Sequence, residues 1–502
     1  MNKLLTGTIA DQKPMSNNFT TVIGLEVHVQ LATQSKLFCG CSTRFGAEPN
    51  TQTCPVCIGM PGTLPVMNRK AYELSLKTAV ALNCKIPEFT KWDRKQYYYP
   101  DLPKGYQISQ FDLPMSADGY LEISDTKGRF ETKRVGITRA HLEEDAGKSI
   151  HDEVAGKADS QIDLNRTGTP LLEIVSEPDM RSSVEARAFL QQLKLLLTYL
   201  GVSDCNMQEG SLRVDANVNL HLQIETSQVA TPIVEIKNMN SFRAVERALD
   251  YEAERQYQVW QETGQQLGEA PKQTRGWDDA AGVTRGQRSK EESSDYRYFP
   301  EPDLLPITTT ADQVERIRSS LGELPVALQA RLSGDYGLSD YDADVLVNQG
   351  RQVVDYFLQV AEGCGDAKSA CNWVTQDVLR VLKEQVQSIG VFPIAAEQLA
   401  ALIAAINSNQ LPGTRAKEVF QLMLDEVVDI SQAIEKLGIE QVDESELVAL
   451  CQELLDANPK IVDDLRGGKH QAVGALIGQA KKKNANVAPG RVREIFLKLA
   501  QQ

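Results

Sequence analysis

Residues 22–31 read VIGLEVHVQL, and this stretch decides the fold prediction. Its apolar side chains occupy positions 23, 25, 27, 29 and 31, whereas Glu26, His28 and Gln30 occupy alternate positions. A period of two is typical of a strand with one buried face and one polar face. Three further stretches alternate in a similar way: 135–138, 212–222 and 233–236.

Strands that are buried on both faces would be continuous apolar runs, and these strands are not. The pattern therefore predicts an antiparallel or mixed sheet whose polar face is a possible catalytic floor. A helix is predicted to begin at Ser182, which has capping-box spacing to Glu185, and to end before Gly201. A second helix is expected at about 242–262. The fold class is therefore α+β.

The pattern changes near residue 300, and long helical stretches dominate from about residue 321. The segment 264–295 has little periodicity and is interpreted as a mobile excursion. We predict a sheet domain over 1–305, an all-α helical domain over 306–427 and a small α-helical tail domain over 428–502.

The chain has 502 residues and a net charge of −15, so it is a poor general binder of nucleic acid and no DNA partner is expected. The sequence contains no run of about 18 apolar residues, so no membrane span is predicted. The N-terminus has no secretory apolar segment. We expect a cytoplasmic protein, or one of an organellar stroma or matrix. Residues 458–502 contain nine Lys and Arg against three Asp and Glu. This basic end is either a solvated domain or a phosphate-contacting module.

Four of the nine cysteines are clustered as C-x-C, twelve residues and C-x-x-C: Cys39, Cys41, Cys54 and Cys57. Thiolates at this spacing can close a tetrahedral zinc site, and four free thiols are the alternative. Four thiolates leave no open coordination position, so a zinc ion here would be structural.

Histidine and carboxylate side chains recur in three separate segments. Glu26 and His28 share one face of a strand, residues 141–145 read HLEED, and Glu173 follows two leucines. One histidine with two or more carboxylates can bind a divalent cation such as magnesium. Spacing alone leaves surface salt bridges as the alternative. Residues 145–149 match only half of a phosphate-loop motif, because position 142 is leucine.

Several long strings of this sequence resemble the kinase and transferase subunit of the aspartyl/glutamyl-tRNA(Asn/Gln) amidotransferases. They cover most of residues 20–305 in the family's order: 23–30, 97–110, 139–148, 165–179, 209–215 and 295–303. The resemblance implies a cradle domain related in fold to glutamine synthetase and guanidino kinases. It also implies that this cradle binds ATP and Mg²⁺ without a phosphate loop.

The same resemblance assigns residues to roles. Magnesium ligands fall on His28, Glu143 and Glu173. Beyond the resemblance, we expect Glu26 to orient His28 or a metal-bound water and Glu144 or Asp215 to accept a proton from ammonium, so Glu26 and Glu144 are also candidate catalytic residues. A hydrophilic ammonia passage would include Lys95, Lys104, Glu144 and Asp215. The four clustered cysteines match the zinc site of some family members. The basic tail resembles a tRNA-contacting module, with the candidate residues Lys469, Lys481, Lys482, Lys483, Arg491 and Arg493.

The implied function is ATP-dependent phosphorylation of the glutamyl or aspartyl group on misacylated Glu-tRNA(Gln) or Asp-tRNA(Asn), followed by amidation. Ammonia would come from an amidase-type glutaminase partner, and a small bridging subunit would complete a heterotrimer. Two alternatives remain: a non-catalytic tRNA-binding scaffold, and a glutamine-synthetase-like ligase that acts on a free amino acid.

Overall fold

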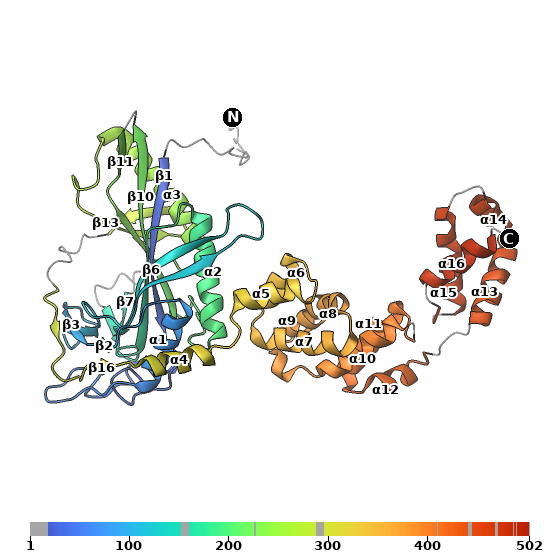
Figure 1. Ribbon diagram of the computed structural model, residues 1–502, viewed down its shortest axis with the longest axis horizontal. Helices are drawn as coiled ribbons and strands as arrows, with labels where there is room; N and C mark the ends of the chain where they lie inside the picture. The colour runs from blue at the N-terminus through green and yellow to red at the C-terminus, as the bar shows by residue number, and fades with distance from the viewer. Residues whose placement is uncertain are drawn as a thin grey trace, which may run out of the picture. The chain divides into compact units, whose positions relative to one another are not determined.

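The computed structural model describes residues 19–151, 160–224, 227–287, 296–408, 410–439, 444–466, 470–484, 486–487 and 489–500 (Figure 1). Contacts divide the chain into two compact units, one ending at Pro325 and the other beginning at Val326. The division into three domains at residues 305 and 428 stays a prediction.

A nine-stranded sheet forms the centre of the first unit, in the order β14-β13-β12-β10-β1-β9-β6-β5, with β11 beside β10. Its strands are β1 (Phe19–Gln30), β5 (Ala117–Ile123), β6 (Lys133–Glu144), β9 (Pro170–Ser176), β10 (Leu212–Ile224), β11 (Ser227–Ala230), β12 (Val234–Lys237), β13 (Gln273–Asp278) and β14 (Val283–Gly286). Neighbours pair antiparallel except β12 and β13, which are parallel. The predicted mixed sheet is confirmed, and 22–31 corresponds to its central strand β1.

Helices α1 (Arg69–Ala81), α2 (Ser183–Tyr199) and α3 (Phe242–Thr263) contribute to one hydrophobic core with the apolar face of the sheet. The Ser182 hydroxyl accepts from the backbone N–H of Glu185 and caps α2 as predicted. Ser241 caps α3 in the same way, and Gly264 ends that helix in the left-handed conformation.

The interpretation of 264–295 as a mobile excursion is wrong for residues 273–286, where β13 and β14 pair antiparallel. The signal was missed because this order depends on distant partners. β13 pairs with β12, and the buried carboxylate of Glu252 on α3 accepts a hydrogen bond from Thr284. Residues 288–295 lie outside the described residues.

Three smaller sheets lie beside the central one. β3 (Asp93–Gln96) pairs with β4 (Tyr106–Ser109) and β15 (Phe299–Pro300), β2 (Phe89–Thr90) pairs with β16 (Ile307–Thr308), and β7 (Lys148–His151) pairs with β8 (Ser160–Asp163). Helix α4 (Ala311–Ser320) then packs on α1 within the same unit.

The second unit is helical over the residues described. Its elements are α5 (Pro325–Gly334), α6 (Asp340–Val347), α7 (Arg351–Cys364), α8 (Ala367–Trp373), η2 (Val374–Val378), α9 (Leu379–Glu384), η3 (Ile389–Val391), α10 (Ala396–Asn407), α11 (Gly413–Glu426), α12 (Ile430–Lys436), α13 (Glu444–Asp456), α14 (Pro459–Arg466), η4 (His470–Ala472), α15 (Val473–Lys483) and α16 (Pro489–Ala500). Helices α13 to α16 share a hydrophobic core of their own. Within the described chain, no helix is both long and apolar enough to cross a membrane.

Leu25→Ala tests the role of β1 in the core. Leu25 is buried at the centre of the sheet, so its truncation should lower the free energy of unfolding by about 2–5 kcal/mol. Urea unfolding followed by tryptophan fluorescence measures the change. Leu64→Ala is the control, because the Leu64 side chain is largely exposed and should change stability by less than about 0.5 kcal/mol.

Candidate functional site

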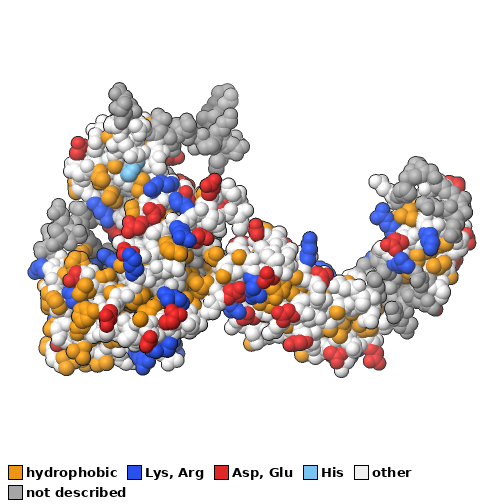
Figure 2. All heavy atoms as spheres, viewed as in Figure 1, with side chains coloured by type: hydrophobic (Ala, Val, Ile, Leu, Met, Phe, Trp, Pro, Cys, Tyr) orange, Lys and Arg blue, Asp and Glu red, His pale blue; other side chains and the backbone are white. Residues whose placement is uncertain are grey.

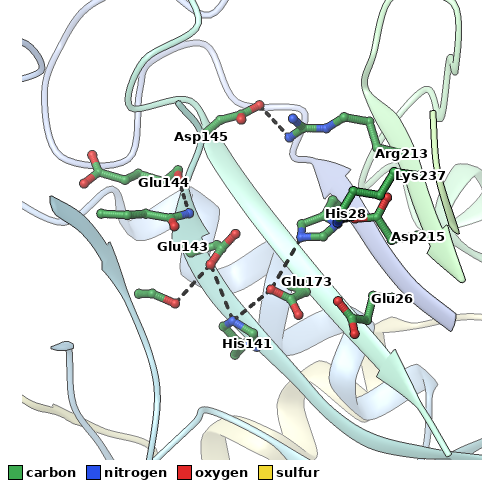
Figure 3. A network of polar contacts seen from close by, with 12 residues as sticks. Glu26, His28, His141, Glu143, Glu144, Asp145, Glu173, Arg213, Asp215 and Lys237 are labelled. Carbon is green, nitrogen blue, oxygen red and sulfur yellow. Dashed lines mark hydrogen bonds and ion pairs between the residues drawn. The ribbon is translucent and has the colours of Figure 1, made fainter. Parts of the chain in front are cut away.

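The polar face of the sheet brings His28, Glu143 and Glu173 together (Figure 3). Strand β9 lies between β1 and β6, so Glu173 is directly opposite His28 on one side and His141 on the other. Each of the three predicted residues offers one ligand atom, and these atoms lie within 4.8 Å of one another. The sheet register therefore joins three segments that are far apart in the sequence.

His141 lies between the two carboxylates. Its Nε2 atom is 3.4 Å from Glu173 Oε2 and 3.6 Å from Glu143 Oε2, and the Nε2 atom of His28 is 3.4 Å from Glu173 Oε2. The Ser109 hydroxyl lies 3.0 Å from Glu143 Oε2 and donates to it. His141 was not predicted as a site residue, although it shares the parity of Glu143 on β6.

Positive groups keep these buried carboxylates ionised. Burial alone would raise the pKa of Glu143 and Glu173, but the neighbouring histidines and Lys95 outweigh burial and lower both values. Burial alone would also lower the pKa of His28. The hydrogen bond to Glu173 and the charges of the two carboxylates reverse that effect and raise it.

Lys95 on β3 faces the same carboxylates. Burial alone would lower its pKa, but the negative charges of Glu143 and Glu173 outweigh burial and raise it. Its ammonium also lies 4.7 Å from the ring centroid of Tyr296. The Tyr296 ring and the carboxylates therefore hold a positive charge beside the cluster.

The cluster fits a hard divalent cation. Two carboxylates are suitable ligands for such a cation, and the His28 imidazole can complete the set. Groups around a magnesium ion at about 2.1 Å lie roughly 3–4 Å apart. Like charges at this distance also repel, and the negative charge of Glu173 opposes ionisation of Glu143. A cation at this point would relieve the repulsion.

Asp145 holds two arginines next to the cluster. Its Oδ2 atom is 2.8 Å from Arg213 Nη2 and 3.5 Å from Arg166 Nε, and it accepts from Gln30 at 2.9 Å. Arg166, Arg213 and Gln30 line a cavity of about 760 Å³, to which Lys148 and Lys237 also contribute. Five basic side chains therefore line a volume large enough for a nucleotide, together with the acidic Asp163, Glu209 and Asp215.

Sequence reasoning gave no role to Asp145 or its arginines. The signal was present, because Asp145 continues the parity of His141 and Glu143 along the same segment. Its partners, however, come from other parts of the chain and are 21 or more residues away.

Glu144 projects from β6 away from Glu143, because successive side chains of a strand point to opposite faces (Figure 3). Its Oε1 atom pairs with the Lys104 ammonium and accepts from the backbone N–H of Ile108 at 2.8 Å. Lys104 and Glu144 line a second cavity of about 220 Å³. Asp215 lines the larger cavity instead, where it pairs with Lys237. The predicted passage residues thus do not share one cavity among those described.

Glu26 lies on the same face as His28, as predicted, but it is not part of the three-residue cluster. Its Oε1 atom accepts from Asn217 Nδ2 at 2.8 Å on the neighbouring strand β10. Glu26 is therefore positioned by an amide and not by His28.

Cys39, Cys41, Cys54 and Cys57 form a second cluster, with sulfur atoms within 4.8 Å of one another and no disulfide. A tetrahedral zinc ion with Zn–S bonds of about 2.3 Å would place its sulfurs roughly 3.8 Å apart, so the cluster fits this metal. A hydrogen bond from Cys39 lowers the pKa of Cys57, and the charge of Lys36 lowers it further. The cluster can bind a structural metal.

Five of the six predicted tRNA-contacting residues lie on α15 and α16. Lys481, Lys482 and Lys483 are exposed in the last turn of α15, where Lys483 pairs with Glu453 at 2.5 Å. Arg491 and Arg493 are exposed on α16, where Arg491 pairs with Glu494 at 2.8 Å. Lys469 lies outside the described residues.

Asp145→Asn tests the electrostatic role of Asp145. Burial opposes ionisation of Asp145, but Arg213, Arg166 and Gln30 lower its pKa below the ordinary 3.8. A lowered pKa in the folded state stabilises the protein above the unfolded value, and this stabilisation disappears as the pH falls through the folded value.

The variant should therefore be less stable than the native chain by about 2 kcal/mol at pH 6. Urea midpoints should converge as the pH is lowered below about 4. Asp312→Asn, at an exposed position in the first turn of α4, controls for the loss of one charge. A stability difference that is independent of pH would contradict the assignment.

Comparison with known proteins identifies the family of this chain. The family model described as the GatB/GatE catalytic domain matches residues 21–315, and the model described as the GatB domain matches residues 355–499. The corresponding subunit of the aspartyl/glutamyl-tRNA(Asn/Gln) amidotransferase of Rhodopirellula baltica is 62% identical over 480 residues, which cover 96% of each chain. The protein of the same name from Moorella thermoacetica is 48% identical over 481 residues, which cover 95% of this chain and 99% of that one. The chain therefore belongs to the GatB family of aspartyl/glutamyl-tRNA(Asn/Gln) amidotransferase subunits.

Proposed function

We propose that this chain uses ATP to phosphorylate the glutamyl or aspartyl group of a misacylated tRNA and then converts that group to the amide. Family membership makes the chain a component of a tRNA-dependent amidotransferase. The observation that supports the kinase step is the cluster of His28, Glu143 and Glu173 next to a cavity whose lining includes five basic side chains.

The larger cavity is the proposed nucleotide site. Arg166 and Arg213 can form charge-assisted hydrogen bonds with phosphate oxygens, and Lys148 and Lys237 add positive charge. Asp145 keeps the two arginines in place before the nucleotide arrives, so little free energy is spent on ordering them.

His28, Glu143 and Glu173 would hold a magnesium ion, which would offset the phosphate charge and orient the phosphates. Ser109 and His141 contact the carboxylates and fix their orientation. Lys95, which lies beside the Tyr296 ring, would face the transferred phosphoryl group.

Ammonia cannot displace an oxygen directly from a carboxylate, because oxide and hydroxide are poor leaving groups. Phosphorylation converts that oxygen into phosphate, which leaves readily. A carboxylate oxygen of the aminoacyl group attacks the γ-phosphorus, the bond to the β–γ bridging oxygen breaks, and ADP leaves. Ammonia then attacks the acyl carbon, phosphate departs with the bonding electrons, and the proton that the attacking nitrogen loses is taken up by the departing phosphate. Ammonium must first lose a proton, and Glu144, which lines the smaller cavity, can accept it.

The pair of Lys104 and Glu144 is proposed to line the ammonia route. It lies in a polar cavity on the opposite side of β6 from the cluster of His28, Glu143 and Glu173. An amidase-type glutaminase would supply the ammonia, and a small subunit would bridge the two chains.

Exposed apolar side chains support a partner surface. Hydrophobic side chains gather around β2 and β16 in Figure 2, and Phe89, Leu113 and Leu305 are among the exposed large ones.

The metal of the four-cysteine cluster is proposed to be zinc, and its role is structural because four thiolates complete the coordination. The exposed lysines at the end of α15 are proposed to contact tRNA phosphates.

Adjacent glutamates on β6 provide a matched pair of variants. Glu143→Gln should lower the ATP-dependent phosphorylation of Glu-tRNA or Asp-tRNA by on the order of 100-fold or more, because it removes one proposed cation ligand. Glu144→Gln should retain phosphorylation and instead lower amide formation from glutamine. ADP release and amide formation are measured separately in the reconstituted complex. Normal acyl phosphate formation by Glu143→Gln would sink the kinase proposal.

Lys481 and Lys482 test the tail, because Lys483 is already paired with Glu453. The double alanine variant should weaken tRNA binding and reduce the slope of log affinity against log salt by about two. ATP hydrolysis without tRNA should not change. Lys383→Ala, an exposed lysine on α9, is the control. An unchanged salt slope in the double variant would remove these lysines from the interface.

A further inference from the structure

The loop between the two cysteine pairs forms a wall of the larger cavity. Residues 42–53 connect Cys41 to Cys54, and six of them line the cavity: Thr43, Arg44, Phe45, Gly46, Ala47 and Gln52. Both ends of the loop are thus fixed at the cysteine cluster, while its middle faces the proposed nucleotide site. The geometry of the cluster therefore sets the span of this wall.

The same loop is hydrogen-bonded to a second wall segment, residues 162–165. Asn50 accepts from the Leu164 N–H at 2.8 Å and donates to the Ile162 carbonyl at 3.0 Å. Asn165 Oδ1 accepts from the Gln52 N–H at 2.8 Å. The next residue along the chain is Arg166, the cavity arginine that pairs with Asp145. A shift of the loop would therefore displace a phosphate-binding side chain.

Lys36 contacts the loop 42–53, the wall segment 162–165 and the cysteine cluster. Its side chain is fully buried, and its ammonium donates to the Gln52 carbonyl at 2.7 Å. The same nitrogen lies 3.5 Å from the Leu164 carbonyl and 3.5 Å from the sulfur of Cys57. One amine thus contacts the loop, the second wall segment and the cysteine cluster.

Charge explains why a lysine is suited to this place. A buried ammonium is costly unless it meets a negative charge, and within the described chain its partners are two carbonyls and a cysteine sulfur. Four thiolates around a divalent ion have a net charge of −2. That charge is the natural counterpart of the Lys36 ammonium.

We infer that Lys36 is a positioning residue, which neutralises the metal-bound cysteine cluster and links it to both segments that wall the larger cavity. Loading of the cluster then determines how well the cavity is formed. The statement that this cavity binds a nucleotide rests on the proposed function, whereas the link between the cluster and the walls does not.

Lys36→Met in the full-length chain tests the inference, because methionine fills a similar volume without a charge or a donor. The variant should lose zinc to a chromogenic chelator about 10-fold faster or more. Hydrogen–deuterium exchange should increase in residues 42–53 and also in residues 160–168. Lys77→Met is the matched control: Lys77 likewise donates to a carbonyl, that of Leu200, and should change neither quantity.

Asn165→Ala separates the walls from the metal and remains informative if Lys36→Met does not fold. It should leave zinc release unchanged, increase exchange in residues 42–53 and weaken ATP binding measured by calorimetry. The inference is overturned if Lys36→Met retains native zinc release, or if removing zinc from the native chain leaves exchange in residues 160–168 unchanged. If the native chain fails to bind ATP, the proposed function falls, while the exchange measurements still decide the inference.

Discussion

The register of β1 between β9 and β10 is the constraint on which the site depends. Ile23, Leu25, Val27 and Val29 are all buried in the core, and burying them leaves only one face for His28. Because side chains alternate, a slip of one residue would move the apolar set to the polar face and the charged set into the core. The hydrophobic effect therefore fixes the face on which His28 lies, and the observed register places it opposite Glu173 and Arg213.

The polar face stores charge in a compensated form. Three buried or half-buried carboxylates, Glu143, Asp145 and Glu173, each contact a basic side chain. Glu143 and Glu173 contact His141, and Asp145 contacts Arg213. The surrounding low dielectric strengthens these pairings and makes any unpaired charge costly. Such an arrangement is ready for a cation and for phosphate before either arrives, which is the property that phosphoryl transfer requires.

Strand β6 separates two chemical environments by means of neighbouring residues. Glu143 faces His28 and Glu173, whereas Glu144 faces Lys104 and the smaller cavity. The cysteine cluster borders the second environment, because Gly59 packs directly on Lys104. A Cβ there would lie 2.2 Å from Lys104 Cγ, and its φ of +74° also favours glycine. The segment that carries the cysteine cluster therefore packs directly against the ion pair of Lys104 and Glu144.

The sequence by itself determined the local features: the strand alternation of 22–31, the Ser182 cap, the cysteine spacing and the sharing of one strand face by Glu26 and His28. These depend on neighbours within a few residues, where backbone geometry alone sets the direction of a side chain. The family was also recognisable from long strings of residues. Only the tertiary structure decided which segments meet. Asp145 with Arg166 and Arg213, His141 between two carboxylates and Lys36 at the cysteine cluster all depend on strand order and loop packing. Strand order is set by burial summed over the whole core, and no short window of sequence contains that sum.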